Sequence, residues 1–200
     1  MWPTHPLFVE LGAEIEGRNT FLYPIFLDLS GGRCVVVGGG AVAARKARTL
    51  HEAGAEVVVV SPEVHPALRD MGVEVHERPY EPGDLEGADL AFAATDRREV
   101  NAAVAREAHT RGIRVNVVDR PAEGDFAVPS TLRRGGLQVA VSTGGASPTL
   151  ARRIRGELEE VFGPEWAGVV KELEKVRRGG GTPDADLEGE VSRCLSRLRG

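Results

Sequence analysis

A glycine turn, Gly38-Gly39-Gly40, is the first stretch whose residue types and spacing indicate a binding chemistry. Together with Ala43 it has the spacing Gly-x-Gly-x-x-Ala, which is typical of turns that bind the pyrophosphate of a dinucleotide. Gly38 permits a tight turn, Gly40 lets a phosphate approach the backbone, and the small Ala43 lets a helix pack closely on a sheet. The free N–H groups at the start of that helix then face the phosphates. The alternative is a glycine turn without a ligand.

A second candidate contact lies where the ribose of such a nucleotide would be bound. An acid is expected about 20 residues after the glycines, at the end of the next strand. Ser61 stands at that strand end, and Glu63 follows two residues later. A Glu63 that reaches the ribose hydroxyls favours NAD, but the displaced spacing leaves NADP open.

Asp119 is the carboxylate best placed for acid–base chemistry. It follows an apolar run at 113–118 and precedes Arg120-Pro121. Because strand-end loops carry the chemistry in sheets of this kind, Asp119 can act as a general acid or base beside a nicotinamide. An ordinary turn aspartate is an equally good interpretation of the pattern alone. Asp96 has the same two interpretations, of which helix capping is preferred.

Basic and hydroxyl side chains gather in the last third of the chain. An anion-binding wall and a merely solvated surface both fit the arginines, and the second is the usual outcome for charge runs. Ser142 and Thr143 are interpreted as capping hydroxyls, because no histidine or lysine is placed to activate them for hydrolysis. The arginines concerned are Arg133, Arg134, Arg152, Arg153 and Arg155.

The apolar periodicity predicts the elements that must position these residues. Short apolar runs at 34–37, 56–60, 73–77, 89–95 and 113–118 read as strands, and amphipathic stretches after residue 40 and at 99–111 read as helices. This alternation predicts an α/β fold, a Rossmann-like doubly wound parallel sheet with strand order 3-2-1-4-5. The segment 21–29, interrupted by Pro24, suits an edge segment beside that sheet.

From residue 121 the pattern changes to a small β region followed by helices. Strands are predicted at 126–129 and 137–142, with a turn at 133–136. An isolated strand pair is marginal in water, so a second copy of the chain is the expected partner. Ser147 and Pro148 are predicted to start a helix at 149–162 that buries Leu150 and Ile154. Further helices are expected at 165–178 and 186–198.

These patterns divide the chain into three parts. Residues 1–122 form the dinucleotide-binding domain, of which 1–20 are an N-terminal extension. Residues 123–148 form a β dimerisation region, and 149–200 form a C-terminal helical region with a flexible tail.

Composition restricts the class of protein further. The net charge of −5, with both signs interspersed, argues against nucleic-acid and membrane partners. No run is long enough to span a membrane, and the first residues do not read as a secretion signal, so a cytoplasmic location is predicted. Two cysteines and five scattered histidines lack ligand spacing, and no resident metal site is expected.

The motifs together resemble a known family, the precorrin-2 dehydrogenase/sirohydrochlorin ferrochelatase family, which includes the N-terminal part of siroheme synthase. The matching stretches are collinear over residues 21–178, and their combination is far more specific than any one of them. They include GGGAVAARKA at 38–47, AATD at 93–96, NVVD at 116–119 and STGGASPTLA at 142–151.

The resemblance implies NAD-dependent oxidation of precorrin-2, a polycarboxylate tetrapyrrole, to sirohydrochlorin. Some members then insert Fe²⁺ to give siroheme, and members are homodimers. An NAD-binding regulatory module and a chelatase for another metal, cobalt, are the alternative functions. Because the chain ends near residue 200, a separate enzyme is expected to supply precorrin-2.

The resemblance also assigns residues. The family's catalytic aspartate falls on Asp119, and a hydroxyl residue of the loop after the second predicted β-region strand falls on Thr143, beside Ser142. We add Arg152 and Arg153 as candidates for binding the substrate carboxylates. The expected NAD contacts are Gly38, Gly39, Gly40, Ala41, Val42, Ser61, Pro62, Glu63 and Thr95.

Overall fold

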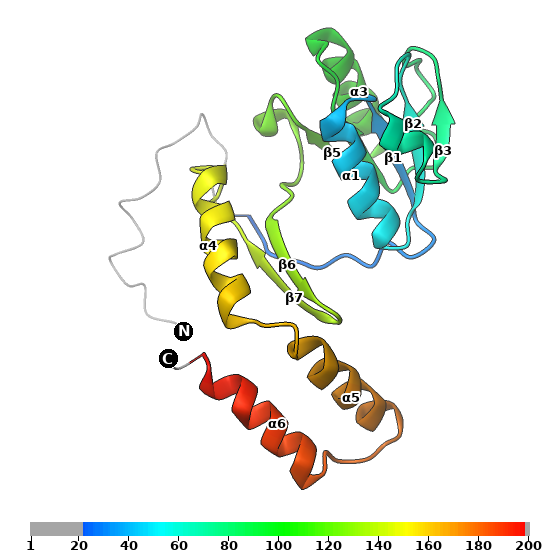
Figure 1. Ribbon diagram of the computed structural model, residues 1–200. Coiled ribbons are helices and arrows are strands. Elements are labelled where there is room, and N and C mark those ends of the chain that lie inside the picture. Colours follow the sequence, from blue (N-terminus) through cyan, green and yellow to red (C-terminus); the bar gives the residue numbers. More distant parts are fainter. Residues whose placement is uncertain (1–21, 199–200) are drawn as a thin grey trace, which may run out of the picture. The chain divides into compact units, whose positions relative to one another are not determined.

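In the computed structural model, which describes residues 22–198, the chain forms two compact units (Figure 1). One comprises Leu22–Val128, and Pro129 begins the other. The predicted extension at 1–20 lies outside the described residues. The three-part division at 122 and 148 stays a prediction.

The first unit is built on a five-stranded parallel sheet with the order β3-β2-β1-β4-β5, which confirms the predicted doubly wound fold. The register is continuous from strand to strand, so that Val37 pairs with Val60 on one side and with Ala93 on the other. The strands are β1 (Arg33–Val37), β2 (Glu56–Val60), β3 (Glu74–His76), β4 (Leu90–Ala93) and β5 (Arg114–Val117).

Helices cover both faces of this sheet, as a parallel sheet requires. Helix α1 (Ala41–Glu52) packs on one face and α3 (Arg98–Arg111) on the other (Figure 1). Alternate residues of each strand point to opposite faces of the sheet and pack into the hydrophobic core on that face. For example, Val36 packs on the α1 side and Val37 on the α3 side. Helix α3 ends where Gly112 adopts a left-handed conformation with φ of 71°. The short helices α2 (Pro66–Arg69) and η2 (Pro121–Glu123) complete the unit.

The second unit begins with an antiparallel pair, β6 (Ser130–Arg134) and β7 (Leu137–Val141). The prediction of a strand at 126–129 was wrong. Pro129 has no N–H for a ladder, and the ring of Phe126 packs edge-on against Phe92, with 5.4 Å between ring centroids. Residues 126–128 therefore belong to the sheet unit, and Pro129 begins the second unit.

Three helices follow the β6–β7 pair, and they are α4 (Pro148–Val161), α5 (Trp166–Arg178) and α6 (Ala185–Ser196). Ser147 caps α4 as predicted, since its hydroxyl accepts the N–H of Leu150 at 3.1 Å. The expected burial of two α4 side chains was wrong. Leu150 is 49% exposed and Ile154 is 38% exposed. A small core at Trp166, Val169 and Cys194 joins α5 to α6.

Two further findings concern the described residues. Leu22–Leu29 form no strand, so the expected edge segment is not part of the sheet. No helix within 22–198 combines the length and the apolar character needed to cross a membrane.

Candidate functional site

The glycine turn lies directly after β1 and is wedged between the ends of two neighbouring strands. Gly38 has φ of +126°, and a Cβ atom there would lie 2.4 Å from the carbonyl oxygen of Ala94, beyond β4. A Cβ on Gly39 would lie 1.8 Å from the carbonyl oxygen of Glu63, beyond β2. Both positions therefore exclude any side chain. Gly38 was predicted to make the tight turn, and Gly39 proves to be the most confined of the three glycines.

Gly40 differs from its neighbours, because a Cβ there would meet nothing within 4 Å. It occupies the N-cap position of α1 without a capping side chain, and no acidic residue lies in the first turn. The exposed start of α1, at Ala41 and Val42, thus presents unpaired N–H groups and open space together. This arrangement fits the pyrophosphate of a dinucleotide, which needs backbone donors and a close approach.

The loop after β2 is fastened to the glycine turn. The hydroxyl of Ser61, a buried residue, donates to the carbonyl oxygen of Glu63 at 2.7 Å. The N–H of His65 donates to the carbonyl oxygen of Gly39, also at 2.7 Å. Pro62 and the side chain of Glu63 are exposed. Ser61 therefore shapes the loop, and Glu63 is the member of this pair whose side chain can meet a ribose.

A buried amide joins the ends of β4 and β5. Asn101 of α3 is 1% exposed, and its Nδ2 donates to Asp119 Oδ1 at 2.8 Å and to the carbonyl oxygen of Thr95 at 3.0 Å. Its Oδ1 accepts the N–H of Thr95 at 3.1 Å and the Thr95 hydroxyl at 2.7 Å. Two predicted site residues, Thr95 and Asp119, are thus brought together by a third that was not predicted.

Sequence reasoning missed Asn101, although a signal was present. Asn101 stands in helical register with Val104, Ala105 and Ala108, which are all buried, so it is a polar residue at an inward position. The preferred capping role of Asp96 was wrong, since the N–H of Arg97 donates to the Thr95 hydroxyl at 3.1 Å instead.

The Asp119 carboxylate keeps one side open, and its side chain is 36% exposed. The Nε atom of Arg98 lies 3.9 Å from Asp119 Oδ2, while the Arg98 guanidinium pairs with Glu123. A carboxylate that is held on one oxygen and accessible on the other can take a proton from a bound molecule.

Phe92 of β4, which packs against Phe126, also contacts a half-buried lysine of α1. The Nζ atom of Lys46 lies 5.7 Å from the centroid of the Phe92 ring. Burial, and secondarily the charge of Arg45, lowers the pKa of Lys46. The amide of Asn116 donates to the carbonyl oxygen of Phe126 at 2.9 Å and fixes the segment that follows Asp119 beside Phe92.

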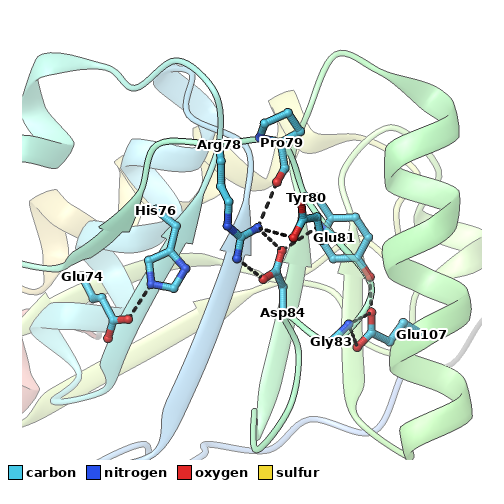
Figure 2. A network of polar contacts seen from close by, with 9 residues as sticks. All are labelled: Glu74, His76, Arg78, Pro79, Tyr80, Glu81, Gly83, Asp84 and Glu107. Atoms are coloured by element: carbon cyan, nitrogen blue, oxygen red, sulfur yellow. Dashed lines mark hydrogen bonds and ion pairs between the residues drawn. The ribbon is translucent and has the colours of Figure 1, made fainter.

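A polar network anchors the other end of α3 (Figure 2). The hydroxyl of Tyr80 donates to Glu107, which also accepts the N–H of Gly83 at 3.0 Å. Burial and this carboxylate raise the pKa of Tyr80. Arg78 and Asp84 pair at 2.5 Å on the same crossover between β3 and β4. The bonds of Glu107 fasten the C-terminal half of α3 to the crossover between β3 and β4.

The remaining predicted site residues lie in the second unit. The Thr143 hydroxyl accepts the N–H of Ser147 at 3.0 Å and donates to its carbonyl oxygen at 3.1 Å, and the Ser142 hydroxyl accepts the N–H of Gly144 at 3.2 Å. These contacts confirm the interpretation of both as capping hydroxyls. Arg152 and Arg153 are exposed on α4.

Several of the five candidate arginines already make contacts, and Arg152 donates to the Thr149 hydroxyl at 3.2 Å. Arg134 donates to the carbonyl oxygens of Glu159 and Phe162, and Arg155 pairs with Glu159. Across residues 22–198, no cluster of three or more His, Cys, Asp or Glu side chains is suited to hold a metal ion.

Comparison with known proteins agrees with this geometry. Residues 25–130, more than half of the chain, match the family described as putative NAD(P)-binding. Residues 134–160 match the sirohaem biosynthesis protein central family. Among solved structures, SirC, a precorrin-2 dehydrogenase, superimposes with a TM-score of 0.68 at 25% identity, over 88% of this chain and 92% of that one.

Curated relatives are more similar in sequence and much longer. Siroheme synthase of Methylobacillus flagellatus is 51% identical over 143 residues, which are 70% of this chain and 31% of that protein. Siroheme synthase of Chromobacterium violaceum is 50% identical over 144 residues, again 70% and 31%. The chain thus spans about a third of the length of these relatives.

The matched residues include the whole glycine turn, the Thr95–Asn101–Asp119 contacts and the sheet that carries them. The ligand expected at this turn is therefore a nicotinamide dinucleotide, as the family description NAD(P)-binding states. The chain belongs to the putative NAD(P)-binding family, as a member related to siroheme synthase.

Proposed function

We propose that this protein oxidises precorrin-2 to sirohydrochlorin with NAD as the oxidant. The observation that carries the proposal is the tether between Thr95 and Asp119 through Asn101, on the strand-end edge that also bears the glycine turn. Ligands of doubly wound sheets bind beyond the carboxyl ends of the strands, around the switch in strand order. Strands β1 and β4 flank that switch here, and the turn and Thr95 follow them directly.

The reaction removes two hydrogens from the tetrapyrrole. When bound, NAD supplies the acceptor for the hydride. The Asp119 carboxylate is the group that accepts the accompanying proton, because it is held at one oxygen and accessible at the other. The electron pair of the bond that loses its proton stays in the substrate and forms the new double bond. The substrate thus loses one hydride and one proton for one double bond gained.

The proposed NAD contacts follow the geometry of the turn. The backbone of the glycine turn and the first turn of α1 binds the pyrophosphate, and Glu63 binds the adenosine ribose. An exposed carboxylate at that position disfavours a 2′-phosphate, so we expect NAD to be used in preference to NADP. The full set is Gly38, Gly39, Gly40, Ala41, Val42, Ser61, Pro62, Glu63 and Thr95.

Substrate binding is proposed for residues of the second unit. Arg152 and Arg153 are exposed cations on α4 and suit a polycarboxylate. Thr143 and Ser142 shape the loop that precedes them. Replacing both arginines by alanine should raise the KM for precorrin-2 and leave the KM for NAD unchanged; equal KM values for precorrin-2 would contradict this assignment.

We further propose a homodimer. The strands β6 and β7 form a sheet of only two strands, and α4 exposes Leu150 and Ile154. A second copy of the chain that covers these side chains would remove them from water. Light scattering of the purified protein tests this, and a strictly monomeric particle would refute it.

Two finer proposals concern the product and the compartment. Fe²⁺ is proposed as a second substrate, inserted into sirohydrochlorin, whose ring nitrogens are the final ligands. Comparing Fe²⁺ with Co²⁺ under anaerobic conditions distinguishes the iron from the cobalt reaction. We also propose that the enzyme works in the cytoplasm, which cell fractionation tests.

The main experiment is anaerobic incubation with precorrin-2 and NAD, followed by NADH absorbance. Asp119→Ala should lower kcat by about 100-fold or more, as expected for loss of a general acid–base group. Glu99→Gln removes another carboxylate at the start of α3, one that pairs only with exposed Arg97 in the described part, and should keep the wild-type rate. A full rate in Asp119→Ala would remove the role given to this residue, and no NADH with the wild-type protein would refute the proposed function.

A further inference from the structure

Asn101 is a buried polar side chain for which the sequence motifs provide no role. Its amide lies between Thr95, beyond β4, and Asp119, beyond β5. We infer that Asn101 is a positioning residue, which fixes the Asp119 carboxylate through Oδ1 and leaves Oδ2 as the oxygen that accepts the substrate proton. The inference rests on the function proposed above.

The orientation of the amide follows from its partners. A backbone N–H can only donate, so the N–H of Thr95 requires the amide oxygen on its side. The amide nitrogen then faces the carbonyl oxygen of Thr95 and Asp119 Oδ1, which both accept. Both acceptor positions and both N–H groups of Asn101 are thereby used, and at 1% exposure water cannot replace them.

No other residue type can make this set of contacts from the same backbone position. Aspartate has no N–H to give, and leucine has neither donor nor acceptor. Glutamine carries the same amide on a longer side chain, which moves it away from one of the strand ends. The asparagine therefore sets the distance between Thr95 and Asp119.

The two oxygens of Asp119 consequently differ. Oδ1 is engaged by the buried amide, whereas Oδ2 faces Arg98 Nε at 3.9 Å, which is too long for a hydrogen bond. Within residues 22–198, no donor is hydrogen-bonded to Oδ2. In the oxidation, Oδ2 would take the proton from the substrate, and bound NAD would supply the hydride acceptor.

The expected effect of losing the tether is kinetic. A misplacement of about 1 Å of a group that takes part in the reaction can cost about 100-fold in rate. Substrate binding depends on other side chains, so the KM values should change by less than about threefold. A general loss of folded protein would also lower the apparent kcat without altering either KM, so the two causes are separated by a control variant that is destabilised but keeps Asn101.

The test compares Asn101→Leu with Glu107→Gln in the full-length chain. Glu107 also lies on α3 and accepts from Tyr80 and Gly83, but it does not contact Asp119, so it controls for loss of a buried polar contact on the same helix. Asn101→Leu should lose about 100-fold in kcat for NADH formation from precorrin-2. Glu107→Gln should lower Tm and keep kcat. A wild-type kcat in Asn101→Leu, or equal losses of kcat in the two variants, would overturn the inference.

Asn101→Asp provides a readout that a merely structural residue would not move. It places a second carboxylate against Asp119, and the groups facing the pair are Arg98, which is bonded to Glu123, and the hydroxyl of Thr95. Two carboxylates at hydrogen-bond distance share one proton, so the acidic limb of the kcat profile should move to higher pH. If the acidic limb of the kcat profile lies at the same pH in Asn101→Asp as in the wild type, the inference is contradicted.

Amide hydrogen exchange at Thr95 tests the tether without turnover. The N–H of Thr95 donates to Asn101 and should exchange faster in Asn101→Leu, but not in Glu107→Gln. Unchanged exchange would overturn the tether whether or not the protein oxidises precorrin-2. Absence of NADH in the wild-type protein would instead refute the proposed function, and the two failures are therefore distinguishable.

Discussion

The two units of the chain differ in how completely they bury their apolar residues. In the sheet unit, α1 and α3 cover opposite faces, and the central valines of β1 and β2 are almost fully buried. In the second unit, α5 and α6 share a small core, while α4 exposes Leu150 and Ile154. A parallel sheet obtains a helix with each crossover, so one chain can close both of its faces. An antiparallel pair has no such crossover, so the burial of apolar side chains in its unit depends on which other segments cover it.

The polar residues of the two units differ in the same way. Asn101 and Asn116 of the sheet unit are buried amides that hold segments 18 and 10 residues further along the chain. The hydroxyls of Ser142 and Thr143 make contacts only within their own loop. The sheet unit is thus preorganised by tertiary contacts, whereas the loop before α4 is organised locally.

The largest expected effect tests how tightly the sheet unit is closed. Gly39→Ala places a Cβ 1.8 Å from the carbonyl oxygen of Glu63 and must displace backbone. We expect the free energy of unfolding to fall by about 3 kcal/mol, together with loss of NAD binding. Denaturant unfolding and NAD titration measure the two effects.

Gly40→Ala is the matched control for that change. Its Cβ meets nothing within 4 Å and its φ of −77° suits any residue, so the fold should keep its stability. The added methyl would occupy the space that the pyrophosphate needs, so NAD affinity should fall alone. Equal stability of the two alanine variants would show that the backbone around Gly39 can shift to accommodate a side chain.

The second prediction concerns the uncovered face of α4. Replacing Leu150 and Ile154 together by glutamate should hardly change the unfolding free energy of a single chain, because both side chains are already partly exposed. If a second copy covers them, dimerisation should weaken by about 3 kcal/mol or more. Sedimentation at several protein concentrations measures this, and an unaltered dimer would place its interface elsewhere.

The third prediction uses pH to probe the crossover between β3 and β4. The hydrogen bond from Arg78 lowers the pKa of Asp84 below its ordinary value of 3.8. The contact therefore stabilises the fold at pH values above 3.8, and that contribution is lost as the pH falls through the lowered pKa of the folded state. Asp84→Asn should cost about 1.5 kcal/mol at neutral pH.

The difference between wild type and Asp84→Asn should shrink as the solution is acidified. Unfolding free energies measured for both proteins from neutral pH down to about pH 3 follow this change. A constant difference would mean that the ion pair does not supply the stability.

The smallest expected effect is that of Tyr80→Phe. The change removes the hydrogen bond from Tyr80 to Glu107 (Figure 2). Glu107 still accepts from Gly83 and Arg111. The unfolding free energy should fall by about 1 kcal/mol, with kcat unchanged. A loss of kcat would show that this network reaches the Asp119 site and is not only an anchor of α3.

Much of the sheet unit could be predicted from local patterns. Short valine-rich runs after glycine or polar turns indicated buried parallel strands, and Gly112 marked a helix end, as observed. In the second unit, Ser147 marked the start of α4 in the same way. The strand at 126–129 could not be predicted correctly, because a contact between Phe126 and Phe92, far away in the sequence, outweighs local strand preference.

The sequence by itself determined the order of strands and helices, the glycine turn and the identity of Asp119 as a strand-end carboxylate. These depend on periodicity and on residues close together in the chain. Only the tertiary structure decided that Gly39 is the most confined glycine and that Asn101 holds Asp119. Both follow from distances between segments that the fold brings together, Gly39 with Glu63 and Asn101 with Asp119, and no local pattern encodes such distances.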